Sequence, residues 1–237
     1  MKKIIIFLLF ILIITGCAKN SDELVMVTEA GFAPYEYYDN GEIVGVDVDI
    51  AKEIAKELGK KLVIKDVAFD SIINEVKTGK ADFGAAGISY SDERAKEVDF
   101  SINYSVSKQV VIVKDDSNIK STNDIFDKSI AVQLGSIADT FISEKYPNAN
   151  IIRQKKYLSA IEDLKNDKVN CVVMDELPAK EILVSNSGLK ILPGFLTNDS
   201  YGMIVKKGNT ELLNTINTVL NRLVQDVKKK SDKNNLD

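Results

Sequence analysis

The sequence predicts an α/β protein in which strands and helices alternate along the chain. Short apolar runs such as 24–28 and 130–133 have the length and composition of buried strands. Between such runs lie segments with helical spacing, for example Ile50, Ile54 and Leu58 at intervals of four residues. Glycines and acids follow several of these runs. This alternation favours a mostly parallel sheet with helices on its faces.

The first half of the chain supplies one set of elements. Asp47 is expected to cap the first helix, and Asp39-Asn40-Gly41-Glu42 is typical of a hairpin turn because Asn and Gly tolerate positive φ. Strands are expected at 24–28, 62–64 and 81–86, and helices at 47–59 and 70–79.

The pattern restarts in the second half. Strands are expected at 107–114, 130–133, 151–153, 169–174, 190–192 and 201–205, and helices at 160–166, 178–188 and 212–224. A second α/β unit is therefore expected within the chain, from about 106 to 196. The charged segment 228–237 is expected to be disordered.

Segment 85–94 contains the first candidate site. A small-residue strand ends where Gly87 lets the backbone approach another group, and Arg94 follows in the first turn of an expected helix. Ser89 and Arg94 can then present an amide, a hydroxyl and a guanidinium at the carboxyl end of a strand. Open α/β sheets bind small carboxylates in this way. The alternative is an ordinary surface arginine after a strand.

The composition argues against several classes of function. The formal net charge is −4 and no basic stripe is present, so no nucleic-acid partner is expected. The chain has no histidine and only two cysteines, so neither a metal nor a cofactor is expected. Ser-His-Asp and Cys-His catalytic sets require histidine, and no catalytic residue is assigned.

The N-terminus has the pattern of a targeting segment. Lys2 and Lys3 precede the apolar run 4–14, and Ile14-Thr15-Gly16-Cys17 resembles the lipobox of bacterial lipoproteins. We expect a signal peptide at 1–16, a lipid on Cys17 and a polar tether at 17–23. Removal of 1–16 leaves 221 residues with a formal charge of −6, since two lysines leave with them. A plain signal peptide or a short anchor is the alternative.

Lipidation of Cys17 would leave Cys171 without a disulfide partner. Cys171 lies in an apolar strand pattern and is expected to be a small buried core residue. The lipid would hold the chain on a membrane outside the cytoplasm.

Several motifs occur together in a fixed order. They are Gly31-Phe32-Ala33-Pro34-Tyr35-Glu36-Tyr37, Gly45-Val46-Asp47-Val48-Asp49-Ile50, Phe69-Asp70-Ser71-Ile72-Ile73, Ala86-Gly87-Ile88-Ser89 with Asp92-Glu93-Arg94, Val98-Asp99-Phe100-Ser101, Val132-Gln133-Leu134-Gly135-Ser136, Val173-Met174-Asp175-Glu176-Leu177-Pro178-Ala179 and Gly208-Asn209-Thr210-Glu211-Leu212-Leu213. With these motifs in this order, the sequence closely resembles the family 3 extracellular solute-binding proteins of bacterial ABC importers, over about residues 24 to 225.

The resemblance implies a two-lobed periplasmic-binding-protein-like fold of type II. Lobe 1 would comprise 24–105 and 197–227, and lobe 2 would comprise 106–196. Two crossings near 104–108 and 197–201 would form a hinge, and a ligand would close the cleft. The expected partners are a free amino acid and an ABC permease, and the chain is expected to act as a monomer.

The resemblance also implies how the ligand is held. Arg94 would grip the amino-acid carboxylate, and Asp175 from the other lobe would accept hydrogen bonds from the ammonium. Burying a zwitterion is unfavourable unless both ends meet such partners. The Ser89 and Ser136 amides would bind the carboxylate, while the Ser89 hydroxyl and the Gly87 carbonyl would help with the ammonium.

The remaining expected contacts surround the ligand side chain. Phe32 and Phe69 match the stacking residues of the family, and core packing is their alternative. Glu29 would face a cationic or amide side chain unless it is merely solvated. The expected ligand-binding set is Glu29, Phe32, Phe69, Ala86, Gly87, Ser89, Arg94, Gln133, Ser136, Ile137 and Asp175. Gln133 could instead simply end its strand, and Ile137 makes this wall more apolar than in some relatives.

The sequence leaves two alternatives to amino-acid capture. A dehydratase on the same scaffold needs an acid at a leaving hydroxyl, and Glu29 and Glu176 are candidates without a neighbouring base in the sequence. An extracellular amino-acid sensor module is the second alternative. The resemblance favours a transport receptor that catalyses no reaction.

Overall fold

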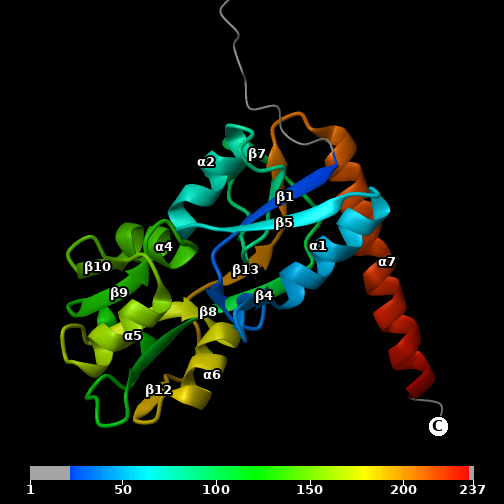
Figure 1. Cartoon of the computed structure of the whole chain (residues 1–237). Coiled ribbons are helices and arrows are strands. Elements are labelled where there is room, and N and C mark those ends of the chain that lie inside the picture. Colours follow the sequence, from blue (N-terminus) through cyan, green and yellow to red (C-terminus); the bar gives the residue numbers. More distant parts are fainter. Residues whose placement is uncertain (1–21, 235–237) are drawn as a thin grey trace, which may run out of the picture.

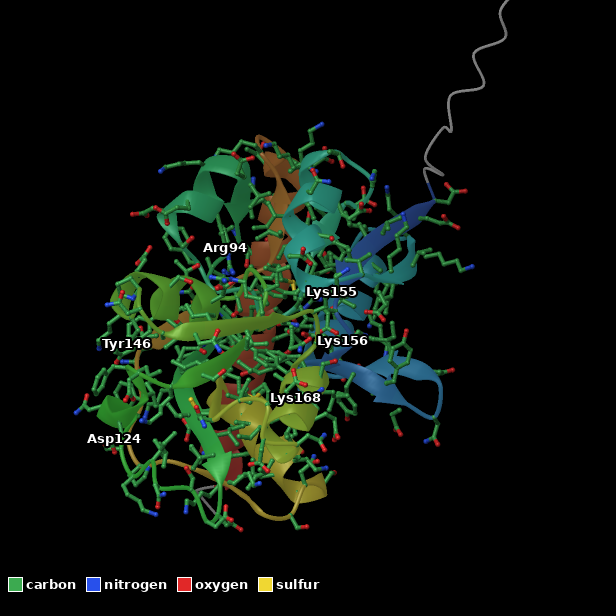
Figure 2. All side chains as sticks on the ribbon, turned by 90° about the vertical axis from the view of Figure 1, so that its left-hand side faces the viewer. Arg94, Asp124, Tyr146, Lys155, Lys156 and Lys168 are labelled. Carbon is green, nitrogen blue, oxygen red and sulfur yellow. The ribbon has the colours of Figure 1, made fainter. Side chains whose placement is uncertain are left out.

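The computed structural model describes residues 22–234, and the side chains of residues 22–226. Two lobes, each with its own sheet, lie side by side (Figure 1), and Figure 2 shows their border after a quarter turn. The predicted α/β class and two-lobed architecture are confirmed. The expected signal peptide 1–16, Cys17 and most of the expected tether lie outside the described residues.

The first lobe is built on a sheet with the strand order β5-β1-β6-β14-β7. β1 pairs in parallel with β5 and β6, while β14 runs antiparallel to β6 and β7. Because β14 follows all the strands of the second sheet along the chain, this lobe is assembled from both ends of the described sequence. The bounds are β1 Glu23–Thr28, β5 Lys61–Asp66, β6 Phe83–Gly84, β7 Val98–Phe100 and β14 Ile204–Lys206.

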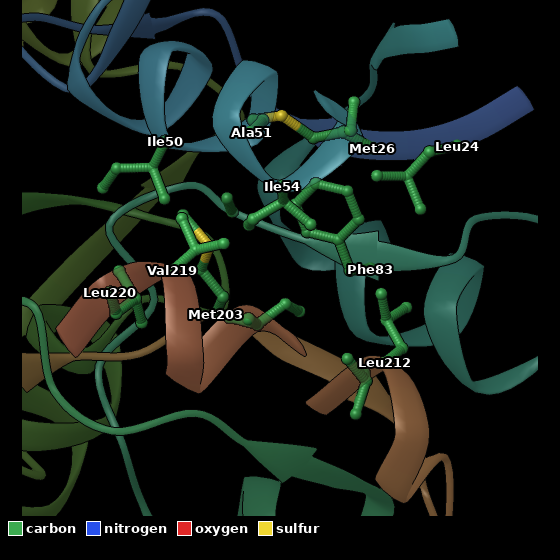
Figure 3. Close-up of a cluster of buried hydrophobic side chains, with 14 of the residues drawn as sticks. Leu24, Met26, Ile50, Ala51, Ile54, Phe83, Met203, Leu212, Val219 and Leu220 are labelled. Carbon is green, nitrogen blue, oxygen red and sulfur yellow. The ribbon is translucent and has the colours of Figure 1, made fainter. Parts of the chain in front are cut away.

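The first-lobe sheet is covered on both faces because successive β1 side chains point to opposite sides. Leu24 and Met26 pack with helices α1 (Val46–Glu57) and α7 (Thr210–Asn234), as Figure 3 shows for part of this core. Val25 and Val27 pack on the other face, with α2 (Ile72–Lys77). The continuous apolar strand of the sequence therefore lies between two helical layers.

A small sheet of three strands flanks the first lobe, with the order β2-β3-β4. Asn40 and Gly41 have φ angles of 48° and 87° in the turn between β3 and β4, so the predicted hairpin turn is confirmed. The bounds are β2 Gly31–Phe32, β3 Glu36–Asp39 and β4 Glu42–Val44.

Asp47 does not cap the first helix as the sequence analysis expected. Helix α1 begins at Val46 with Gly45 at its N-cap, and no side chain caps it. Asp47 is inside the first turn and fully buried, and its Oδ2 accepts hydrogen bonds from the Gly87 amide at 3.2 Å and the Tyr104 hydroxyl at 2.9 Å. The carboxylate therefore links the start of α1 to the loop after β6.

The second lobe is built on a sheet with the order β10-β9-β11-β8-β12. β10, β9 and β11 are parallel, and β8 runs antiparallel to β11 and β12. Cys171 on β11 is a free, buried core residue, as expected. The bounds are β8 Ser105–Lys114, β9 Ser129–Gln133, β10 Asn150–Gln154, β11 Cys171–Asp175, β12 Leu189–Ile191, α4 Ile137–Lys145, α5 Tyr157–Lys165 and α6 Glu176–Ser185.

The chain passes between the sheets in two paired strands. β8 and β13 (Asn198–Tyr201) are antiparallel, with Asn198 opposite Lys108 and Tyr201 opposite Ser105. β7 precedes β8 and β14 follows β13, so each of these strands leads from one sheet to the other. We call β8 and β13 the crossing strands.

Three helical segments complete the described chain. Arg94 lies in α3 (Asp92–Glu97), whose N-cap Ser91 accepts a hydrogen bond from the Arg94 amide, so the predicted helix start is confirmed. The other two are single 3-10 turns, η1 Phe69–Ser71 and η2 Thr122–Ile125.

Several boundaries differ from those expected. β6 is shorter than the expected strand 81–86, and α5 begins at Tyr157, three residues before the expected helix. Disorder was expected from residue 228, but α7 continues to Asn234, and 235–237 lie outside the described residues. No glycine or proline interrupts 210–234, and lysine is a good helix former, so nothing local ends the helix earlier.

Within the described part of the chain, none of the helices combines the length and the apolarity that crossing a bilayer requires.

Two residues of α7 test whether its buried face stabilises the first lobe. Ile216 is fully buried, whereas Val224 is 58% exposed. We expect Ile216→Ala to lower the free energy of unfolding by about 2–5 kcal/mol because it leaves a core cavity, and Val224→Ala to lower it by less than about 0.5 kcal/mol. Urea unfolding followed by circular dichroism measures both. Equal effects would contradict this packing of α7.

Candidate functional site

One cavity between the lobes brings together every predicted ligand-binding residue. All eleven line it, and Glu36 and Tyr157 line it as well. Several of them stand where strands end: Glu29 directly follows β1, Ala86 follows β6 by two residues, and Gln133 and Asp175 are the last residues of β9 and β11. Ligands of open α/β sheets bind outside such carboxyl ends.

Arg94 is positioned by both lobes (Figure 2). Its Nη1 donates to the Ser89 carbonyl at 2.6 Å and its Nη2 donates across the border to the Gly135 carbonyl at 2.9 Å. The guanidinium carbon lies 5.6 Å from the centre of the Phe69 ring, a cation–π distance. Burial lowers the pKa of Arg94 while Asp199 and Asp175 raise it. Since arginine stays protonated in proteins, this group is a permanent cation in the cavity wall.

Asp175 is the buried acid of the second lobe. It is only 6% exposed and accepts hydrogen bonds from Gln109 Nε2, at 2.8 Å, and from the Tyr201 hydroxyl. Burial raises its pKa to about 6, although these hydrogen bonds oppose the rise. Gln109 Nε2 also donates to Asp199 at 2.7 Å. Both donors to Asp175 come from the crossing strands.

An aromatic cluster forms one wall. The Phe32 ring stacks on Tyr35 and Tyr157, with centroids 5.9 and 5.8 Å apart. At Gly87 the backbone has a φ of +54°, and a Cβ there would lie 2.6 Å from Phe32. The close approach predicted at Gly87 is therefore present, and Phe32 is the group approached.

A second part of the cavity wall is acidic. Glu29 is 2% exposed, so the alternative of a merely solvated glutamate is wrong. Gln133 Nε2 donates to Glu29 at 3.2 Å across the border, and Lys156 Nζ lies 3.4 Å from Glu29 Oε1. Burial raises the pKa of Glu29, and Lys156 and Gln133 lower it.

Glu36 was missed as a cavity residue by the sequence analysis. It is fully buried on β3, opposite Phe32, and its carboxyl faces the buried carboxyl of Asp47. Burial, followed by the nearby Asp47, raises the pKa of Glu36 well above its ordinary value. The sequence does contain a signal for this residue, because Glu36 stands between two tyrosines, where a strand would carry an acid among aromatic side chains.

Tyr157 was also missed, because the helix was expected to begin only at 160. It is buried at the start of α5 and lines the cavity, with its hydroxyl beside the Ser136 side chain. Tyr157 and Glu36 add buried polar groups to the wall, which suits a polar ligand.

Ser136 differs from its expected role. Its amide donates to the Gln133 carbonyl at 3.1 Å and its hydroxyl caps α4 by accepting from the Asp139 amide at 3.1 Å. In this arrangement the amide is therefore already used and does not offer a free donor to a carboxylate. Ile137, the next residue, contributes an apolar part of the wall.

The cavity is narrow. Its volume is about 10 Å³, far less than an amino acid occupies. With Arg94 and Glu29 both bonded across the border, the lobes are close together in this structure. The walls must move apart before a molecule of amino-acid size enters.

Among the described residues, those expected for a dehydratase or a metal site are not gathered at the cavity. Glu176, one candidate acid for a dehydratase, pairs on the surface with Lys180 at 2.6 Å and does not line the cavity. Among the residues that the structure describes, no cluster of three or more histidine, cysteine, aspartate or glutamate side chains is arranged to hold a metal ion.

The fold and the cavity define a two-lobed solute-binding protein, with a cation and acids supplied to one cleft by different lobes. The model of the family "Bacterial extracellular solute-binding proteins, family 3" matches residues 24–234. The chain belongs to this family, and the resemblance noted in the sequence is confirmed.

Individual relatives agree with this assignment. The chain is 28% identical to the "Arginine-binding extracellular protein ArtP" of Bacillus subtilis, covering 88% of this chain and 84% of that protein. It is 38% identical to arginine-bound ArgBP from T. maritima, with a TM-score of 0.83 over 85% of this chain and 96% of that one. An ancestral arginine-binding protein bound to glutamine is 36% identical, with a TM-score of 0.83 over 89% and 95%.

The raised pKa of Asp175 leads to a prediction for the unliganded protein. The protonated carboxyl of Asp175 contributes stability to the fold that is fully present below its ordinary pKa of 3.8, and this stability is lost as the pH rises through about 6. We expect Asp175→Asn, which stays neutral, to gain stability relative to the natural chain between about pH 4 and about pH 7. Urea midpoints across this range measure the difference. A difference independent of pH would contradict the assignment.

Proposed function

We propose that the chain is the receptor of an amino-acid ABC importer and captures a free L-amino acid with a polar or basic side chain, arginine being the first to test. The observation that carries the proposal is that Arg94 and Asp175, which come from different lobes, line the same cavity. Each end of a zwitterion then has an opposite charge to meet, which offsets the desolvation of both.

The two ends of the ligand would have separate places. The α-carboxylate would bind beside Arg94 and Phe69, and the α-ammonium would bind Asp175, which is held by Gln109 and Tyr201. Because the carboxylate of Asp175 is the better acceptor, ligand binding would favour its ionised form and lower its pKa. The Phe32 wall would cover the aliphatic part of the ligand.

The side chain would extend toward the acidic end. Asp175 would be occupied by the α-ammonium, so Glu29 remains as a buried acid in the cavity lining, and this supports a cationic or amide-bearing side chain. The relatives whose names state arginine binding support the same choice. The glutamine-bound ancestral protein supports keeping an amide in the ligand class.

Closure would follow from the same geometry. A ligand held by Arg94 and Asp175 contacts both lobes, so it stabilises the closed arrangement relative to an open one. The crossing strands would act as the hinge. The closed form would then be presented to a permease, and the expected domain division at 24–105 with 197–227 and 106–196 describes the moving parts.

The N-terminal segment completes the proposal. A lipid on Cys17 would hold the receptor on the outer side of a membrane, next to the permease. The lipobox-like Ile14-Thr15-Gly16-Cys17 supports this, as does the membership of an extracellular solute-binding family.

Calorimetry with the ligand-free full chain tests the capture of an amino acid. Arg94→Ala and Asp175→Ala should each weaken arginine binding by about 3 kcal/mol or more, over 100-fold in Kd, because each strands a buried charge. Arg222→Ala is the matched control, since Arg222 pairs with Glu53 and Glu57 on the surface. No binding of any of the twenty amino acids to folded natural chain would reject the function.

Metabolic labelling with a radioactive fatty acid tests the anchor. We expect Cys17→Ala to abolish both the label and the recovery in the membrane fraction. Cys171→Ala should keep both, because the Cys171 thiol is buried in the core of the second lobe. Label that persists in Cys17→Ala would reject lipidation at this residue.

A further inference from the structure

Lys156 occupies a position that local rules disfavour. It is the N-cap of α5, where Ser, Thr, Asp and Asn are preferred and where a cation opposes the helix dipole. Lys155 precedes it, so two cations stand at this helix start. In Figure 2 both lie where the second lobe meets the N-terminal strands of the first. Local propensity does not explain Lys156, whereas its contacts across the border do.

The Lys156 ammonium faces two acids of the first lobe. Its Nζ lies 3.4 Å from Glu29 Oε1 and 3.8 Å from Asp66 Oδ2. Glu29 is the more deeply buried of the two acids, and its Oε1 accepts no hydrogen bond from any described residue. Among the described residues, Lys156 therefore supplies the cation nearest to Glu29 Oε1, an oxygen that has no other partner. Lys155, in contrast, is exposed and forms no ion pair with the described residues.

Lys156 also has room to move. Its side chain is 47% exposed and it lines an open groove of about 500 Å³ on the outer side of Glu29, together with Gly31, Tyr38 and Leu158. The ammonium can turn into this groove without being buried. The contact with Glu29 is thus exchangeable, unlike the hydrogen bonds of Asp175 in the interior.

We infer that Lys156 is a specificity-determining residue that competes with the ligand for Glu29. This inference rests on the proposed capture of an amino acid. A cationic side chain that reaches Glu29 must either displace the Lys156 ammonium or be repelled by it at close range. A neutral side chain of the same shape is not repelled by Lys156 and need not displace it. Lys156 therefore reduces the preference of the site for a cationic ligand over its neutral isostere.

Arginine and citrulline are a suitable pair of probes, because a urea group replaces the guanidinium without changing the shape of the rest. The quantity measured is the ratio of the citrulline Kd to the arginine Kd, by calorimetry on the ligand-free full chain. Lys156→Gln should raise this ratio about tenfold or more, corresponding to about 1.4 kcal/mol. Lys156→Arg, which keeps the charge, should leave it within about twofold of the natural chain.

Lys155→Gln is the matched control for net charge, and its ratio should stay at the natural value because Lys155 does not face the acids. Thermal melts without ligand verify that each variant is folded. An unchanged ratio in Lys156→Gln, or an equal rise in Lys155→Gln, would overturn the inference while leaving amino-acid capture intact. Failure of the natural chain to bind either probe would instead reject arginine as the ligand, and the inference with it.

Discussion

The structure depends on keeping opposite charges buried in one cleft between two lobes. Arg94 and Asp175 are both held by neighbours that belong to the fold: the guanidinium by two carbonyls from different lobes, and the carboxyl by a glutamine and a tyrosine from the crossing strands. A buried charge without partners is unfavourable by several kcal/mol. These neighbours offset part of that cost, although burial still raises the pKa of Asp175 to about 6.

The topology explains why so many site residues could be found from the sequence. A residue that directly follows a parallel strand lies at the carboxyl edge of its sheet, and the two sheets turn these edges toward the same cavity. Glu29 directly follows such a strand, and Gln133 and Asp175 are the last residues of theirs. The resemblance to the family supplied their expected place and roles, and their positions at strand ends explain why the cleft contains them.

The residues that were missed or misjudged depend on longer-range contacts. Glu36 lies on a short strand whose side chains could not be assigned to a face before its pairing with Phe32 was known. Asp47 has the local signature of a helix cap, but the amide of Gly87 and the hydroxyl of Tyr104 draw it into the interior. Ser136 is different, because local contacts use it: its hydroxyl caps its helix and its amide bonds Gln133 in the preceding turn. For Glu36 and Asp47, local sequence rules cannot weigh the tertiary partners.

The crossing strands do more than connect the lobes. Gln109 on β8 and Tyr201 on β13 hold Asp175, and Gln109 also holds Asp199 on β13. The crossing strands therefore supply the side chains that hold Asp175, the acid of the cleft. A substitution at Gln109 or Tyr201 would alter both the crossing strands and the support of Asp175. A change in ligand specificity would therefore arise more readily near Glu29, because its partners Gln133 and Lys156 lie outside the crossing strands. One end of the cleft is therefore tied to the crossing strands, and the other end has partners that lie outside them.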